Sequence, residues 1–113
     1  RVAFVKYKIT KKVLSKILHL FSKWKYIIFK DWEFSKFTTL LKFNKDHRFC
    51  IKYMNITGYE FYFEDFKNII NGLKTNKSFR ENIQVFQFKI KGKEKEQEQE
   101  ILEENHFTNC KTY

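Results

Sequence analysis

The side chains that could do chemistry in this chain are basic and aromatic. Its 113 residues include 23 Lys and Arg, 14 Phe, 6 Tyr and 2 Trp. Basic groups neutralise phosphates and rings stack on unpaired bases, so the composition favours contact with nucleic acid. The three His and two Cys show neither Cys-x-x-Cys nor His-Glu-x-x-His spacing, and no Gly-rich loop could hold a phosphate. We therefore expect no enzyme, no cofactor, no metal site and no small-molecule substrate.

Charge divides the chain into two parts. Residues 1–93 carry 21 Lys and Arg against 7 Asp and Glu, a balance of +14, whereas residues 94–113 carry 2 against 6, a balance of −4. A body this basic attracts polyanions, of which RNA is favoured over a membrane surface. No run of eighteen apolar residues could span a bilayer, so we expect no membrane partner. The sequence predicts one domain over 1–93 and an acidic, low-complexity tail over 94–113, for which disorder is favoured.

The hydrophobic pattern predicts the elements that would position these side chains. Alternation predicts strands over 2–9, 34–43, 48–57 and 83–90, and steps of three and four predict helices over 13–24 and 63–73. This order is typical of an α+β, ferredoxin-like βαββαβ sandwich. Its sheet would have four antiparallel strands with two helices on one face. The apolar run 26–29 is left without an assignment.

Short motifs along residues 1–91 resemble the bacterial-type small ribosomal subunit protein six family, in a mitochondrial form. Asp31-Trp32 precedes the second expected strand, Met54-Asn55-Ile56 ends the third, and residues 79–87 form the closing basic phrase. Gln87 stands where that family usually has Arg. The resemblance implies a structural constituent of the small ribosomal subunit in the mitochondrial matrix. It also implies two partners, the small-subunit ribosomal RNA and small ribosomal subunit protein eighteen.

Within the expected sheet, basic residues at the start of the first strand and around the fourth are the candidate phosphate contacts. We predict RNA binding by Arg1, Lys77, Arg80, Lys89, Lys91 and Lys93. An ordinary solvated lysine face is the alternative for each of them. Parity places Phe4 on the open face of the first strand, and it places Phe86 and Phe88 there too if Val85 faces the helices. We predict that Phe4, Phe86 and Phe88 meet a protein partner there, since monomers rarely expose large apolar patches.

Two other functions fit the same sequence. One is a non-ribosomal RNA-binding module of the RNA recognition motif type, although Arg48-Phe49-Cys50-Ile51 lacks the glycine expected in its third strand. The other is a protein–protein adaptor subunit of an organellar complex. Salt separates the adaptor from both RNA-binding hypotheses, because phosphate contacts weaken as salt rises.

Overall fold

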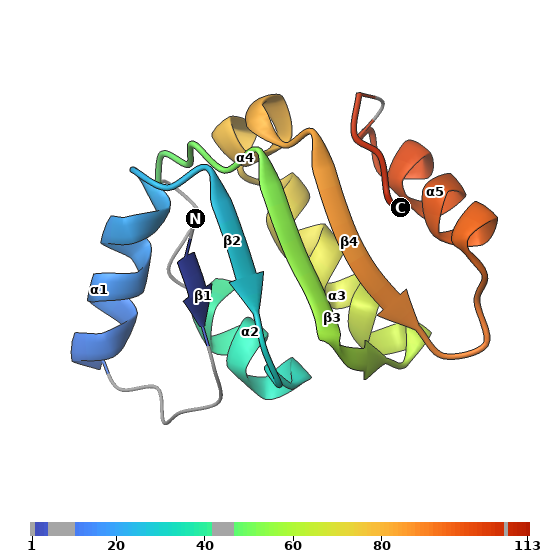
Figure 1. Ribbon diagram of the computed structural model, residues 1–113, viewed down its shortest axis with the longest axis horizontal. Helices are drawn as coiled ribbons and strands as arrows, with labels where there is room; N and C mark the ends of the chain where they lie inside the picture. The colour runs from blue at the N-terminus through green and yellow to red at the C-terminus, as the bar shows by residue number, and fades with distance from the viewer. Residues whose placement is uncertain (1, 5–10, 42–46, 108) are drawn as a thin grey trace.

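A computed structural model of the chain describes residues 2–4, 11–41, 47–107 and 109–113 (Figure 1). Strands and helices alternate along most of this length. In chain order they are β1 (Val2–Phe4), α1 (Lys11–Phe21), β2 (Tyr26–Phe29), α2 (Phe34–Leu41), β3 (Tyr53–Phe61), α3 (Phe63–Lys74), α4 (Lys77–Asn82), β4 (Val85–Ile90) and α5 (Lys95–Glu104).

The sheet is parallel throughout. β2, β3 and β4 form an all-parallel three-stranded sheet, and the short β1 adds to β2 in the same direction, giving the order β1-β2-β3-β4. The predicted ferredoxin-like sandwich with four antiparallel strands is therefore wrong. Neighbouring parallel strands need a crossover connection, and α1, α2 and the α3–α4 pair provide the three crossovers.

Two segments account for the wrong topology. Residues 34–43 were predicted to be a strand, but Phe34–Leu41 is the helix α2. Phe34, Phe37 and Leu41 also lie at steps of three and four, so the helical period was present beside the alternating one. The unassigned run 26–29 is the strand β2, whose Ile27 and Phe29 are buried. Short apolar runs of this kind are typical of strands in buried parallel sheets.

The other predicted elements are closer to the structure. The helices expected over 13–24 and 63–73 are confirmed as α1 and α3, and the strand expected over 83–90 is confirmed as β4. The strand expected over 48–57 begins later, at Tyr53, and continues through Gly58 to Phe61. Periodicity therefore located these elements well where the hydrophobic stripe had only one plausible period.

One face of the sheet carries the hydrophobic core. Its buried strand residues are Ile27, Phe29, Met54, Ile56, Phe86, Phe88 and Ile90. Ring contacts join this face to each of the helices α1, α2, α3 and α4, in the pairs Phe21–Phe29, Phe29–Phe37, Phe66–Phe88 and Phe79–Phe86. These contacts place α1, α2, α3 and α4 on this face, and no helix of the described residues covers the opposite face of β2, β3 and β4, which we call the uncovered face. In Figure 1, α2 and α3 lie behind the sheet and the uncovered face is toward the viewer.

The connectivity is that of β/α repeat proteins, in which each unit adds one strand beside the last. Successive paired residues lie 25, 27, 32 and 26 positions apart, in the pairs Val2–Ile27, Tyr26–Tyr53, Tyr53–Val85 and Val85–Lys111. Stacking units in this way aligns equivalent positions of successive strands in rows across the sheet. The uncovered face is therefore an extended surface built from every unit.

The tail over 94–113 was expected to be disordered, but its described residues 94–107 and 109–113 lie along the outer edge of β4. The helix α5 opens with a capping box formed by Glu94 and Gln97, and it buries Ile101 and Leu102. After α5, Lys111 pairs with β4, donating its N–H to Gln84 O at 3.0 Å and accepting from Phe86 N at 3.0 Å. The local sequence is strongly polar, but a few apolar anchors and a sheet edge with unpaired N–H groups are enough to hold it.

The buried carboxylate Glu98 of α5 makes the stability of this edge depend on pH. Its Oε2 accepts the Ile90 N–H at 3.2 Å, and its Oε1 lies 3.7 Å from Lys95 Nζ. Burial raises the pKa of Glu98 above its ordinary value of 4.5. The folded state then binds more protons than the unfolded state just above the ordinary carboxyl range, so stability falls as pH rises through that window.

Glu98→Gln is expected to remove this part of the pH dependence while keeping an acceptor for Ile90 N–H. The measurement is the urea midpoint from about pH 4 to about pH 8. The native midpoint should fall relative to that of the variant as pH rises through the window. Glu96→Gln removes the same charge from an exposed position of α5 and should follow the native curve. Parallel curves for native protein and Glu98→Gln would contradict the expectation.

Candidate nucleic-acid interface

Two tyrosines stand side by side where β2 and β3 begin. Tyr26 and Tyr53 are paired in the parallel register, and their ring centroids are 5.6 Å apart with an interplanar angle of 34°. Both alternate with buried core residues, so their side chains project from the uncovered face. Tyr26 is 50% exposed. A ring pair of which one member is half exposed can stack against flat partners such as nucleic-acid bases.

Three lysines lie in a row at the same end of the sheet. Lys52 N and Tyr53 N donate to Lys25 O at 2.8 and 2.9 Å, which places Lys25 beside Lys52. Gln84 N donates to Lys52 O at 2.8 Å, and Lys111 N donates in turn to Gln84 O at 3.0 Å. Lys25 and Lys52 therefore lie side by side where β2 and β3 begin, and Lys111 lies beyond Gln84 and Val85, in register with Val85 of β4. We call Lys25, Tyr26, Lys52, Tyr53 and Lys111 the rim.

A hydrogen-bonded cluster fixes the uncovered face next to the rim. The Tyr53 hydroxyl donates to Gln87 Oε1, which also accepts from Asn55 Nδ2 at 3.1 Å. Asn55 Oδ1 accepts from Thr57 N at 2.8 Å and from its Oγ1 at 2.6 Å. Because each of these acceptors serves two donors, the Tyr53 ring is held in one orientation. The Gln87 Nε2 donor makes no hydrogen bond within the described residues.

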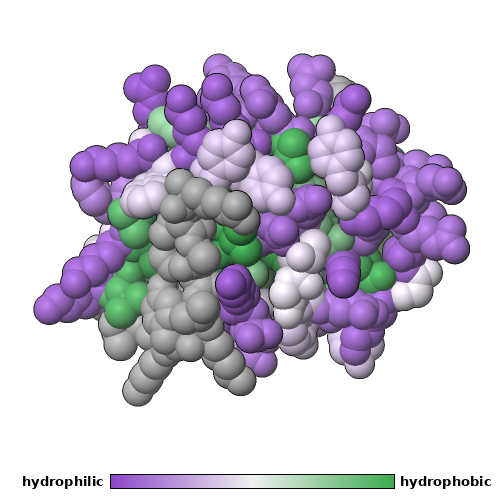
Figure 2. Space-filling view, viewed as in Figure 1, coloured by the Kyte–Doolittle hydropathy of each residue, from purple (hydrophilic) through white to green (hydrophobic). Residues whose placement is uncertain are grey.

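Further cations gather at the rim's end of the sheet. The segment 47–52 is tied to α4 by hydrogen bonds from Phe49 N to Ser78 Oγ at 2.9 Å and from Asn82 Nδ2 to Phe49 O at 2.9 Å. This brings the exposed Arg48 toward the helix that carries Lys77 and Arg80. On α4, Glu81 forms an ion pair of 3.7 Å with Lys77. In Figure 2, pale side chains lie among purple ones along the upper part of the uncovered face.

The predicted RNA-binding residues fall into two separate groups. Lys77 and Arg80 lie on α4, near the rim, whereas Lys89, Lys91 and Lys93 lie at the opposite end, where β4 finishes. Arg1 lies outside the described residues. The structure thus does not assemble the predicted cations into a single site.

The lysines at the far end are engaged by rings and faced by carboxylates. Lys91 Nζ lies 3.9 Å from the Tyr62 ring centroid, and Lys93 Nζ lies 4.7 Å from that of Phe63. Contact with the Tyr62 hydroxyl raises the pKa of Lys91 above its ordinary value. Acidic side chains at this end include Glu60, Glu64, Asp65 and Glu94. The solvated-face alternative therefore suits these lysines better than it suits the rim.

The predicted partner-binding rings do not form an open surface. Phe86 and Phe88 are both 0% exposed and pack against Phe66 of α3. The prediction had Val85 facing the helices, but Val85 shares a face with Tyr53 and Gln87, so the parity was inverted by one residue. Phe4 lies in β1, in register with Phe29. Phe86 and Phe88 are core residues and are withdrawn as contact residues.

The sequence analysis missed the rim. Its signal was the dipeptide Lys-Tyr at 25–26 and again at 52–53, each followed by an apolar strand. The 27-residue spacing is close to one repeat, so the two dipeptides occupy equivalent positions in consecutive units. Lys111 could not have been found in this way, because its place depends on a pairing with β4 that no local pattern predicts.

Reactive groups in the described residues are few. Both cysteines are free, and burial raises the pKa of the Cys110 thiol to about 12, which keeps it neutral and unreactive. Across the described ranges, no group of three or more His, Cys, Asp or Glu side chains could hold a metal ion. No helix in the described part of the chain is long and apolar enough to cross a membrane.

Comparison with known proteins adds no relative. No protein-family model matches the chain, and no match was found among curated proteins or solved structures. The functional argument therefore depends on the geometry and charge of the site.

Proposed function

We propose that this protein is a non-catalytic RNA-binding module that holds single-stranded RNA along the rim. The observation that carries the proposal is that three lysines gather with a pair of tyrosine rings, of which Tyr26 is 50% exposed, at one end of the sheet. Lysines neutralise phosphates and release counterions, while base stacking on an aromatic ring contributes about 1–3 kcal/mol per base. The net charge of +10 supports attraction to RNA whatever the nucleotide sequence of the RNA.

The spacing of the rim suits a linear ligand. Neighbouring strands lie about 4.8 Å apart, so three strand steps from Lys25 to Lys111 span about 14 Å. A flexible strand crossing the sheet at this end would meet Lys25 and Lys52 on neighbouring strands, then Lys111 beyond the neutral Gln84 that precedes β4, with rings on the adjoining face. A duplex presents its bases only inside its grooves, so the tyrosine pair favours unpaired RNA.

The ribosomal part of the original hypothesis has lost its structural support. The resemblance to small ribosomal subunit protein six implied an antiparallel βαββαβ sheet, whereas this sheet is parallel with the strands in chain order. Membership of the small subunit, contact with protein eighteen and a mitochondrial location stay hypotheses that rest on short motifs and composition. The RNA-binding part needs only the charge and the rings, so it is the part we propose.

Lys25→Ala/Lys52→Ala is expected to weaken binding of a labelled single-stranded RNA and to lessen its salt dependence. Each phosphate contact on a single strand contributes about 0.7 to the slope of log affinity against log salt, so the slope should fall by roughly 1.4. Fluorescence anisotropy over a salt series gives both quantities. Lys91→Ala/Lys93→Ala is the matched control, since it removes the same charge from the far end of the sheet.

Four outcomes of this experiment distinguish the alternatives. A larger loss with the rim variant supports the proposal, and equal losses with both variants would show attraction by overall charge alone. A larger loss with Lys91→Ala/Lys93→Ala would return the site to the residues predicted from sequence. Absence of RNA binding by the native protein at low salt would sink the proposal and favour a protein-binding adaptor.

A further inference from the structure

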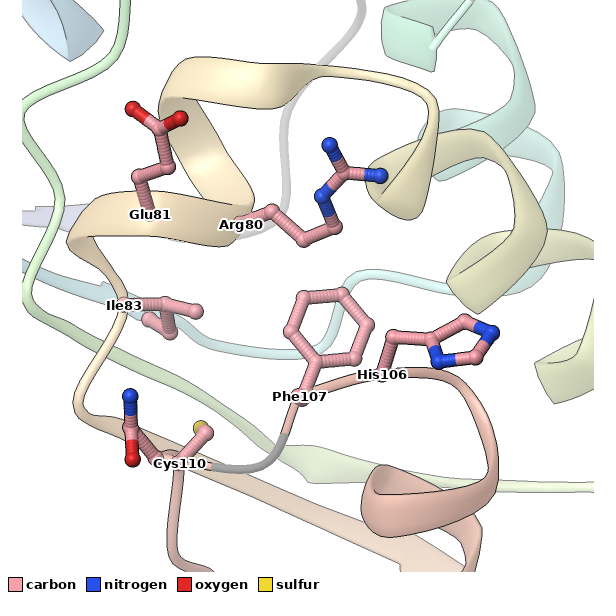
Figure 3. A pocket seen from close by; sticks show the side chains of 7 residues that line it. Arg80, Glu81, Ile83, His106, Phe107 and Cys110 are labelled. Atoms are coloured by element: carbon pink, nitrogen blue, oxygen red, sulfur yellow. The ribbon is translucent and has the colours of Figure 1, made fainter.

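A pocket of about 300 Å³ lies beside the outer end of the rim, between α4 and the segment that follows α5 (Figure 3). Its polar side chains are those of Arg80, Glu81, His106 and Asn109, and its other lining residues are Ile83, Phe107 and Cys110. Two of the lining residues are chain neighbours of the hydrogen-bonded residues Gln84 and Lys111, where the rim ends. Ile83 is followed by Gln84, which accepts the Lys111 N–H, and Cys110 is followed by Lys111 itself.

Hydrogen-bond donors in this pocket are available to a ligand. Arg80 Nη1 donates to Lys74 O at 3.2 Å, which anchors the guanidinium at the end of α3 and leaves its other N–H groups without partners in the described residues. The His106 ring and the Asn109 amide also make no hydrogen bond to the described residues. His106 has a φ of 67°, a left-handed conformation that is uncommon for a residue with a side chain.

The electrostatics of the pocket favour an anion. In Figure 3, Arg80 and His106 lie on the side of the pocket away from Glu81. The Glu81 carboxylate is engaged by Lys77 at 3.7 Å. The raised pKa of Cys110 means that its thiol adds no negative charge. The arginine is therefore opposed by one already paired carboxylate.

We propose that this pocket binds a terminal phosphate monoester of the RNA held on the rim; this inference rests on the proposed function. A terminal monoester carries a charge of about −1.5 to −2 at pH 7, more than an internal phosphodiester. A guanidinium fork matches phosphate oxygens with two parallel hydrogen bonds. A strand running along the rim toward Lys111 reaches the pocket end-on, so its end is the part that enters.

The test uses one single-stranded RNA sequence with an internal label in three forms, with a 5′-phosphate, with a 3′-phosphate, or with hydroxyls at both ends. One phosphorylated form is expected to bind the native protein about tenfold more tightly than the hydroxyl form. Which end gives the gain identifies the polarity of the bound strand. Inorganic phosphate should compete only with that form.

Arg80→Ala is expected to abolish the preference, so that the phosphorylated and hydroxyl-ended forms bind the variant with equal affinity. Arg80→Lys keeps the charge without the fork and should restore only part of the preference. Lys89→Ala, which removes an exposed cation of β4 outside the pocket, should keep it in full. Thermal unfolding by circular dichroism establishes that each variant is folded.

The two proposals fail in different ways. If hydroxyl-ended RNA binds and neither phosphorylated form binds more tightly, the pocket inference is overturned and the rim stands. A preference that survives Arg80→Ala also overturns it. If none of the three RNA forms binds, the proposed function itself fails.

Discussion

Phe66→Ala is expected to lower the free energy of unfolding by about 3–5 kcal/mol, the usual cost of deleting a fully buried phenylalanine ring. Phe66 is 0% exposed, and its ring stacks on that of Phe88 with centroids 4.3 Å apart. It also lies 6.2 Å from Phe86 and 6.4 Å from Phe61. The deletion therefore leaves a cavity between α3 and both of the longest strands.

The expected loss is a large share of the free energy of unfolding of the whole protein. Domains have about 0.05–0.15 kcal/mol of stability per residue, or roughly 6–17 kcal/mol for a chain of this size. Urea unfolding followed by circular dichroism measures the change. Tyr62→Ala, an aromatic truncation one turn earlier at a site 60% exposed, should change stability by only about 0.5 kcal/mol. Similar losses in the two variants would show that Phe66 is not the centre of the core.

The sequence predicted individual elements better than their arrangement. α1, α3 and β4 follow hydrophobic patterns with a single period, so each could be located from local spacing alone. α2 could not, because Phe37 satisfies both an alternating and a helical pattern. Tertiary contacts favour the helix over the strand: the ring of Phe37 lies 5.2, 5.5 and 5.7 Å from the rings of Phe29, Trp32 and Phe61. Predicting a strand where α2 lies removed a crossover helix from the predicted fold, so the predicted sheet became antiparallel.

The candidate site was predictable in composition but not in place. Basic charge and abundant rings predicted a polyanion ligand, and that prediction still awaits its test. The residues assigned to it depended on strand parity, and a shift of one residue moved Phe86 and Phe88 from the expected open face into the core. The rim depends on register between units 27 residues apart, which single-strand patterns do not contain. Sheet faces are therefore fixed by the fold as a whole.

Gly58→Ala is expected to destabilise the protein by about 1–3 kcal/mol although it adds a single methyl group. A Cβ at Gly58 would lie 2.9 Å from Asp31 N, 3.1 Å from Lys30 Cα and 3.1 Å from Phe29 O. All three are backbone atoms, so no side chain can rotate away to make room. The end of β2 must then move away from β3 where the β3–β4 register is already interrupted between Asn55 and Glu60.

Gly92→Ala separates this steric cost from the general cost of replacing glycine. Gly92 has a φ of 75° with nothing within 4 Å of an added Cβ, so its cost is conformational, about 1–2 kcal/mol. Enlarging the side chain further, to Ser and then Val, should increase the loss steeply at position 58, since each added atom is forced against the turn at Lys30 and Asp31. At position 92 the alanine and serine variants should differ little.

Amide chemical shifts of Lys30 and Asp31 should move in Gly58→Ala and stay unchanged in Gly92→Ala. Unmoved shifts in Gly58→Ala would show that β2 and β3 approach less closely here, and the close approach would then not explain why β3 needs glycine at this position.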